Sequence, residues 1–480
     1  MRQWNEVLLS MNVTSFQDLV KGRYGRKIAY TEHESITRDN IMQVIGETIG
    51  VFNYNKPVIK YLWDYFRGDQ PIRYRTKLVR DDIVNRIVEN HAYEIVEFKT
   101  GQTYGEPLQF ISRKDDDAIN RAVDELNNLM IDANKQEKDI KAGEWQSATG
   151  TAFKAVQFAP DSSDIPFNII APTPMNTYVV YNHSTEEPIL AVQELKDVKG
   201  RWYKLCYTDT HTCKIVNGRV AGWTLHAFGG IPIVEYPNNH ERISDIELVI
   251  DILDALNMMQ ANRMDAVEQF VQSWVKFVNC DVDEETFNQM KMQGALVVRS
   301  NNGTDNKADV DIMTQELNQT QTQVAKDDLW ENAEEILAIP KLEGNTGGDT
   351  QGAVELRNGW DASRNRTVIK DPIVKSAEKR LAKIVLNILR IKDNDLGITA
   401  RDFDVQINHS PTDNMVVKCQ SLQYLLECGV NPMVAIKTVG LWGDAEKVFL
   451  LSQPYLDNKY KTVDDEQVSE GIEVESDKRI

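Results

Sequence analysis

The chain has 480 residues, 41% of them hydrophobic and 26% charged, and its formal net charge is −19. This composition is typical of a soluble folded protein, and the length predicts roughly three folding units. The negative charge argues against a protein that grips nucleic acid by neutralising many phosphates, but it suits one that lets nucleic acid slide past.

The sequence shows neither a membrane span nor a signal peptide. No stretch reaches the ~18 consecutive apolar residues that a span needs. The first residues, MRQWNEVLLSMNVTS, lack an apolar core followed by a small-residue cleavage site. We therefore expect no membrane partner and a protein that acts on the cytoplasmic side.

The first half of the chain predicts helices and then a β-rich unit. Residues 1–40 carry mixed signals and are expected to be partly mobile. Pro57 suits the first turn of a helix and Gly68 a C-terminal stop, while TGQTYGEP at 100–107 predicts a glycine-broken turn. Short runs of strand formers separated by turns fill Pro166 to Tyr236. The predicted helices cover residues 37–52, 56–72, 81–98 and 115–133.

A long helix is predicted from residue 245 to 275. Ser244 and Glu247 have the spacing of a capping box, and apolar residues follow in one stripe. No glycine or proline interrupts the segment, so the helix would be ~45 Å long at 1.5 Å per residue. A small α/β insert, with strands at ALVVRS and ADVDIM, precedes a second helix at 320–339. Two long helices with a small insert between their far ends predict a helical stalk that carries a small α/β domain at its tip.

The last part of the chain is mainly helical. Residues 352–390 have a helical pattern, but Pro372 predicts a kink or break near Lys370. A strand, RDFDVQINHS, precedes a helical region at 412–450. The acidic end, residues 461–480, is typical of a solvated tail.

Cysteine chemistry is not expected. The five cysteines are scattered and odd in number, so a disulfide framework or a paired zinc site is improbable. Cys206 and Cys213 flank His211 in CYTDTHTC, but their spacing fits no common zinc pattern. We interpret this segment as a hairpin of ordinary strand residues.

The glycine-rich segment AIPKLEGNTGGDTQGA at 338–353 does not fit a phosphate-binding loop. Such a loop has Gly-Lys-Ser or Gly-Lys-Thr at its end, after a strand and before a helix. Here Lys341 precedes the glycines and a helix comes before it. A flexible connector between helices is one interpretation. The eleven residues from Lys341 to Gln351 are more than a simple turn between two helices needs. The other interpretation is therefore a loop that contacts another molecule.

No catalytic constellation is found in the sequence. The acids at 281 and 283–285 lack the glycine and glutamate of a calcium loop, and they suit a helix N-terminus. Nucleophile-elbow, zinc-protease and dinucleotide-binding motifs are absent, and the seven histidines are dispersed. The sequence therefore predicts no metal site and no cofactor.

In order along the chain, several segments resemble the portal (head-to-tail connector) proteins of tailed bacteriophages, in the siphophage-type family of phages of Gram-positive hosts. GGIPIVEYPNN at 229–239, followed by SDIE at 244–247, carries the resemblance most strongly. The other matches are NRIVENHAYEI at 85–95, TGQTYGEP at 100–107, ATGTAF at 148–153, TYVVYN at 177–182, TQGAVEL at 350–356 and the kinked helix after it.

The resemblance implies an α+β portal fold with a mainly helical stem and crown, a β-rich wing and a small α/β clip. About twelve copies would close into a cyclic ring. The implied parts are the wing at 41–240, the stem helices at 241–275 and 319–340, the clip at 276–318, the tunnel loop at 341–352, the kinked helix and wing strand at 353–411 and the crown at 412–460.

The resemblance also implies a conduit for double-stranded DNA without sequence specificity. The tunnel loop would face the DNA through Lys341, Glu343, Gly344, Asn345, Thr346, Gly347, Gly348, Asp349 and Thr350. The clip would dock the packaging motor, the terminase large subunit, near Asp283, Glu284, Glu285, Asn301, Asn302 and Gly303. Further implied partners are the major capsid and scaffolding proteins and a head-completion adaptor, in the virion and, during assembly, in the host cytoplasm.

Two other functions stay open at this point. One is a metal-dependent hydrolase that uses the acids near 281–285, and the other is an adaptor or scaffold that only binds the motor.

Overall fold

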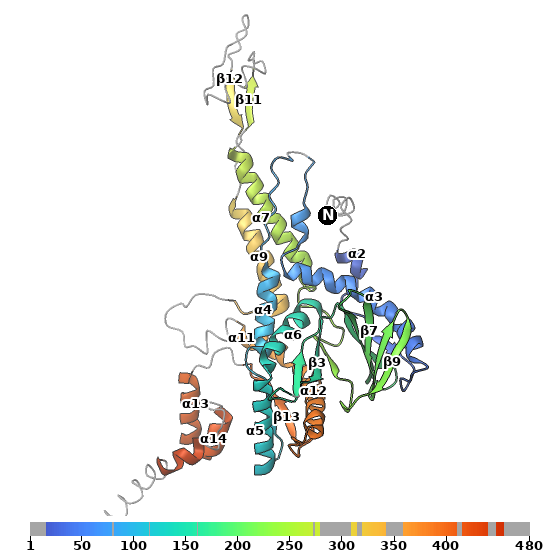
Figure 1. Cartoon of the computed structure of the whole chain (residues 1–480). Helices are drawn as coiled ribbons and strands as arrows, with labels where there is room; N and C mark the ends of the chain where they lie inside the picture. The colour runs from blue at the N-terminus through green and yellow to red at the C-terminus, as the bar shows by residue number, and fades with distance from the viewer. Residues whose placement is uncertain are drawn as a thin grey trace, which may run out of the picture. The chain divides into compact units, whose positions relative to one another are not determined.

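The computed structural model describes most of the chain in two compact units, residues 1–409 and residues 410–480, and each is treated by itself. Figure 1 shows the ribbon. The described residues are 16–78, 81–114, 116–160, 162–271, 274–278, 309–313, 319–341, 359–409, 415–439 and 448–455.

The first unit contains both helices and strands, which agrees with the predicted α+β class. Its helices are α2 (Phe16–Val20), α3 (Ile41–Phe66), η1 (Pro71–Tyr74), α4 (His91–Tyr104), α5 (Asp117–Asp132), α6 (Lys135–Thr149), α7 (Ile250–Val271), α9 (Gln319–Leu337), α11 (Trp360–Val368) and α12 (Asp371–Ile391). Its strands are β1 (Ala29–Thr31), β2 (Gln109–Ser112), β3 (Thr151–Phe158), β4 (Phe167–Ile170), β5 (Thr177–Asn182), β6 (Pro188–Lys196), β7 (Trp202–Tyr207), β8 (His211–Val216), β9 (Arg219–Leu225), β10 (Ile233–Pro237), β11 (Trp274–Val278), β12 (Asp309–Met313) and β13 (Phe403–Gln406).

The second unit is helical where it is described. It contains α13 (Met415–Glu427), α14 (Pro432–Val439) and a further helical segment at residues 448–455.

The β-rich unit forms two sheets. One has the order β1-β5-β6-β7-β8-β9, and apart from the parallel pair β1–β5 its neighbours are antiparallel. Apolar side chains of α3 cover one face of it, including Ile41, Val44 and Phe52. The other sheet has the order β10-β3-β4, and α12 packs against it. Cys206 and Cys213 face each other across β7 and β8 as buried free thiols, which confirms the predicted hairpin of ordinary strand residues.

Two helix predictions in the first hundred residues are wrong. The predicted helices at 37–52 and 56–72 form one helix, α3, with Pro57 inside it. Pro57 is exposed, so the missing backbone hydrogen bond lies on the solvent side, while buried Phe52 and Leu62 anchor the helix in two cores.

The helix predicted at 81–98 begins only at His91. The backbone N–H groups of Asn85 and Glu89 donate instead to side chains of α7, at 2.7 Å from Asp265 Oδ1 and 2.8 Å from Asn257 Oδ1. The helix then continues through Tyr104, so the turn predicted at 100–107 is also wrong in its first half.

The predicted long helix is shorter than expected. Residues 245–249 form turns, α7 runs from Ile250 to Val271, and β11 begins at Trp274. The run WVKFV is rich in β-branched and aromatic residues, which favours a strand. This strand pairs with β12, from Trp274 opposite Met313 to Val278 opposite Asp309. The predicted strand ALVVRS lies outside the described residues.

Within the described residues, no helix is both long and apolar enough to cross a membrane.

A buried group of four charged side chains joins three elements of the first unit. Lys135 and Asp139 of α6, Lys154 of β3 and Glu378 of α12 are at most 4% exposed. Lys154 pairs with both carboxylates, and Lys135 pairs with Asp139 and lies 3.1 Å from Glu378. Burial alone raises the pKa of Glu378, but Lys135 and Lys154 outweigh it and hold that pKa well below its usual range. The balanced charges fix α12 against the sheet.

Replacing one member of this group should leave an uncompensated buried charge. We expect Glu378→Gln to lower the free energy of unfolding by roughly 3–5 kcal/mol. Lys379→Met is the matched control, because Lys379 is the next residue of α12 and its pair with Asp404 is partly exposed to solvent. That control should cost about 1 kcal/mol or less. Chemical denaturation of the purified protein measures both, and equal midpoints for the two variants would contradict this account.

Candidate functional site

The segment between β10 and α7 is held by its own asparagines. The side-chain amides of Asn238 and Asn239 each donate to the carbonyl of Ile243 at 2.9 Å. The backbone N–H of Ile243 donates to Asn239 Oδ1 at 2.9 Å. The sequence PNN therefore folds the chain back on itself just before the turns that lead into α7.

Ser244 and Glu247 form the interaction that their spacing predicts, with one difference. The backbone N–H of Ser244 donates to Glu247 Oε2 at 2.8 Å. The Ser244 hydroxyl accepts from the N–H of Ile246 at 3.0 Å, one residue earlier than in a capping box. It also lies 2.8 Å from the carbonyl oxygen of Ala148. The pair thus stabilises a turn against the end of α6, and the helix starts later.

Two glycines allow this segment to pass close to other backbone. Gly25 and Gly150 have φ of +91° and +85°, in the left-handed region that favours glycine. A Cβ on Gly25 would lie 2.2 Å from the carbonyl oxygen of Glu241, and one on Gly150 would lie 2.0 Å from that of Arg242. ATGTAF and GGIPIVEYPNN, which both carry the family resemblance, are also in direct backbone contact, since the N–H of Asn238 donates to the carbonyl of Gly150 at 3.0 Å.

Two ion pairs tie residues 245–247 to the N-terminal segment and to the residue before α12, the first fully buried and the second partly exposed. Arg26 pairs with Glu247, and both side chains are at most 1% exposed. Asp245 lies 3.1 Å from Lys370, which immediately precedes α12. Burial raises the pKa of Asp245, but Lys370 and Lys99 outweigh it and lower that pKa below its usual value. We call residues 238–249, with these partners, the wing–stem junction, because they lie between the predicted wing and the predicted first stem helix.

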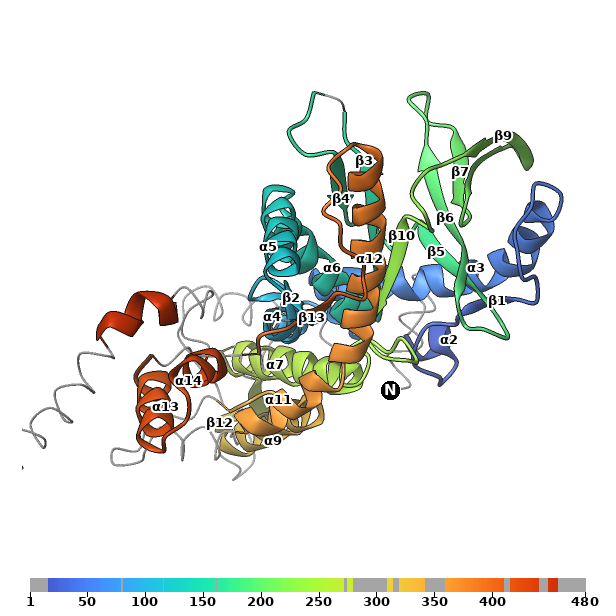
Figure 2. The ribbon, with the colours of Figure 1, turned by 90° about the horizontal axis from the view of Figure 1, so that it is seen from below.

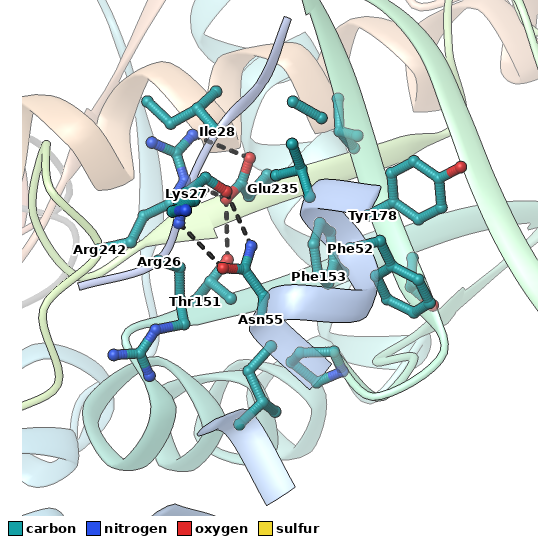
Figure 3. Close-up of a pocket in the computed structure, with 16 residues that line it drawn as sticks. Arg26, Lys27, Ile28, Phe52, Asn55, Thr151, Phe153, Tyr178, Glu235 and Arg242 are labelled. Atoms are coloured by element: carbon teal, nitrogen blue, oxygen red, sulfur yellow. Dashed lines mark hydrogen bonds and ion pairs between the residues drawn. The ribbon is translucent and has the colours of Figure 1, made fainter. Parts of the chain in front are cut away.

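A cavity of about 40 Å³ lies beside the wing–stem junction. Figure 3 shows Arg242 directed at Glu235, and Arg26 pointing away from that pair. Arg242 Nε lies 2.6 Å from Glu235 Oε1, and Thr151 Oγ1 donates to the same oxygen at 2.9 Å. The cavity is far smaller than the roughly 300–1,000 Å³ of ligand sites. We therefore assign the wing–stem junction an anchoring role and not a substrate-binding one.

The two predicted stem helices, α7 and α9, pack side by side (Figure 1). Arg263 Nη1 of α7 donates to Gln323 Oε1 of α9 at 2.7 Å. Ala333 and Leu337 of α9 share a buried apolar cluster with Leu253 of α7. α9 is therefore buried on the side that faces α7, and its opposite side is exposed to solvent.

The free side of α9 is acidic. At 100° per residue, three exposed carboxylates lie opposite Ala333 and Leu337, and a fourth, Asp327, lies about 100° from those two residues at the edge of that side. They are Asp327, Asp328, Glu331 and Glu335, and we call them the α9 acidic face. The sequence analysis did not single them out, although their spacing of i, i+1, i+4 and i+8 within a helical pattern was available as a signal.

Of the residues predicted to face DNA, only Lys341 is described. Its ammonium lies 3.3 Å from Glu331 Oε2, and this hydrogen bond raises the pKa of Lys341. Lys341 therefore turns back onto the α9 acidic face. Residues 343–350 lie outside the described residues, so their role stays a prediction.

The predicted motor-docking residues at 283–285 and 301–303 also lie outside the described residues. The same holds for the acids of the hydrolase hypothesis. Among the residues that are described, no group of three or more histidines, cysteines or acids could hold a metal ion.

Pro372 lies at a helix boundary. α11 ends at Val368, and α12 begins at Asp371 with Pro372 in its first turn, where a missing N–H breaks no helical hydrogen bond. Lys370, where the sequence predicts a kink or break, is the residue that binds Asp245.

A family model described as "Phage portal protein, SPP1 Gp6-like" matches residues 47–417 of the chain. This range includes the wing–stem junction, both stem helices and α12. A search of curated proteins found no significant match.

Solved structures with similar chains come from gene transfer agent particles. A chain of "Neck of empty GTA particle computed with C6 symmetry" has a TM-score of 0.47 at 12% identity, with 73% of this chain and 90% of that chain covered. A chain of "Virion of native gene transfer agent (GTA) particle" has a TM-score of 0.45 at 12% identity, with 82% and 93% covered.

The close approach at Gly150 can be tested against a glycine that has space. Gly150→Ala should force the backbone of Arg242 to move and lower the unfolding midpoint well beyond the effect of Gly200→Ala. Gly200 also has a positive φ, +76°, but no atom lies within 4 Å of its Cβ position. The control should cost only about 1 kcal/mol, for the left-handed backbone alone. Thermal unfolding of the two variants makes the comparison, and equal losses would show that the wing–stem junction tolerates the extra atom.

Proposed function

The chain belongs to the SPP1 Gp6-like family of phage portal proteins, and from this premise we propose that copies of it form a ring at one capsid vertex. Double-stranded DNA would pass through this ring into the head during packaging and out of it during ejection. The family match over residues 47–417 carries this proposal.

The charge of the chain supports a conduit more than a DNA-binding protein. The formal net charge is −19, and the α9 acidic face adds a row of carboxylates along one stem helix. A bore lined by such faces repels phosphate, so DNA is not held tightly and can slide. Only sparse contacts, without base specificity, are then needed.

A closed ring requires two different complementary surfaces on each subunit, because every copy contacts its two neighbours head to tail. We propose about twelve copies. The clip at 276–318 would dock the terminase large subunit, and the opposite end would contact capsid, scaffolding and head-completion proteins. The ring would belong to the virion and assemble in the host cytoplasm.

We propose no catalytic activity for the chain, since portal proteins are structural and the packaging ATPase and nuclease would reside in the terminase. Family membership leaves the metal-dependent hydrolase hypothesis without support.

Electron microscopy of negatively stained, purified protein tests the ring. We expect ring-shaped particles with an axial hole and no metal-stimulated hydrolysis of phosphate esters. Compact monomers with metal-dependent turnover would favour the hydrolase instead, and assemblies without a hole would favour the adaptor.

The predicted tunnel loop has a separate test. Replacing Gly347 and Gly348 by proline removes backbone freedom that a loop following a moving DNA groove would need. The rings should still form, while the DNA packaged per particle should fall severalfold in an in vitro packaging assay. Unchanged packaging in intact rings would remove the assignment of residues 341–352 as the tunnel loop.

A further inference from the structure

One face of the six-stranded sheet is covered only in part by the described residues. α3 packs on the opposite face, where Cys206 and Cys213 are buried. The sheet β10-β3-β4 covers the part of this face nearest β5, since Val179 of β5 and Ala191 of β6 share an apolar cluster with Phe153 of β3. The part formed by the end of β6 and by β7, β8 and β9 lies beyond that cluster.

The strand register gathers six side chains on this outer part. One row across β6, β7, β8 and β9 contains Leu195, Tyr203, Val216 and Arg219, each directly opposite the next. The adjacent row on the same face contains Leu205 and Lys214, because side chains two residues apart in a strand share a face. We call these six residues the outer sheet face.

The outer sheet face has an apolar centre and a basic edge. Its four apolar residues are half-buried and lie outside the clusters that join this sheet to α3 and to the other sheet. Lys214 Nζ lies 4.6 Å from the centre of the Tyr203 ring. Lys214 and Arg219 are exposed, and neither forms an ion pair with a carboxylate among the described residues. An apolar centre beside two such cations is complementary to an acidic, partly apolar partner.

α5 has that composition on its exposed side. Its sequence contains four acids and one arginine. At 100° per residue, Asp117, Glu125 and Asp132 are exposed within about 60° of the point opposite the buried Val123. Ile131, at the edge of this side, is an exposed apolar residue. The exposed side of α5 is therefore acidic and carries an apolar side chain.

The charges on the two surfaces have similar spacing. Glu125 and Asp132 are seven residues apart on α5, which is about 10 Å along the helix axis. Lys214 and Arg219 lie in adjacent rows on neighbouring strands, so their Cα atoms are about 8 Å apart. The long side chains of lysine and arginine cover this difference, so two cations can meet two carboxylates at once.

The two surfaces lie on opposite sides of the first unit. Figure 1 and Figure 2 both show α5 on one side and β7 and β9 on the other, with β3 and α12 between them. One chain therefore cannot bring its own α5 onto its own outer sheet face. Two different complementary surfaces on opposite sides are what a closed head-to-tail ring requires.

We propose that the outer sheet face of one copy binds α5 of the next copy in the ring, so that Lys214 and Arg219 meet Glu125 and Asp132. This inference rests on the proposed function, since the ring is part of it, and it adds the two surfaces through which neighbouring copies bind. The helix covers the half-buried apolar residues of the face, just as α3 covers the opposite face of the same sheet.

A reciprocal exchange of charges in the full-length protein tests this contact. One variant carries Lys214→Glu and Arg219→Glu, and the other carries Glu125→Lys and Asp132→Lys. In either variant alone, like charges face each other at every contact between neighbouring copies. In an equimolar mixture the two variants can alternate around the ring, and opposite charges then face each other at every contact.

We expect each variant alone to need at least about a tenfold higher protein concentration for ring formation, measured by size-exclusion chromatography with light scattering. The equimolar mixture should form rings at the concentration that the unaltered protein needs. The matched control is Lys196→Glu with Lys199→Glu, which makes the same charge change at and beside the end of β6, outside the outer sheet face. It should assemble normally. Because every replaced side chain is exposed, the unfolding midpoints should change little.

Rings that form from each variant alone as readily as from the unaltered protein would overturn this proposal. A mixture that assembles no better than its two components would overturn it as well, because the restored charge pairs would then have no effect. Failure of the unaltered protein to form rings is a different outcome, seen before any variant is mixed. It would contradict the proposed function itself.

Discussion

The structure depends on the passage of residues 238–249 between two glycines and two ion pairs, one of which is fully buried. Arg26 and Glu247 are almost without solvent contact, and each would be costly to leave alone. Gly150 lets the backbone of Arg242 approach to a distance that no side chain permits. Because these contacts join the N-terminal segment, α6 and the start of the stem, the direction of α7 is fixed relative to both sheets.

The role proposed for the α9 acidic face requires that α9 be held in a fixed position. α9 is bound along α7 by apolar packing and by the Arg263–Gln323 hydrogen bond, and at its end by Lys99 and Arg366. Its carboxylates are thus presented on a rigid rod. Fixed carboxylates repel phosphate without any conformational change, so they would prevent DNA from binding tightly to the wall of the proposed channel. The few contacts with DNA are proposed for the segment after Lys341.

Local patterns in the sequence correctly predicted the elements whose structure depends mainly on residues that are near one another in the chain. The β-rich unit, α5, α9 and the Ser244–Glu247 interaction follow from periodicity, turn residues and capping chemistry. One error lies where distant side chains replace helical hydrogen bonds, as Asp265 and Asn257 do for Asn85 and Glu89. Another lies at Pro57, where burial of Phe52 and Leu62 in two cores keeps one helix continuous. The buried ion pairs could not be predicted from the sequence either. Lys154 and Glu378 are 224 residues apart in the chain, and no local pattern indicates that they are partners.

A cryo-electron microscopy reconstruction of the purified assembly, refined without imposed symmetry, tests the central claim most directly. The account predicts a closed ring in which Asp328, Glu331 and Glu335 line the axial hole and the stems of neighbouring subunits enclose it. A reconstruction that places the α9 acidic face on the outer surface, or that shows no closed ring, would contradict it.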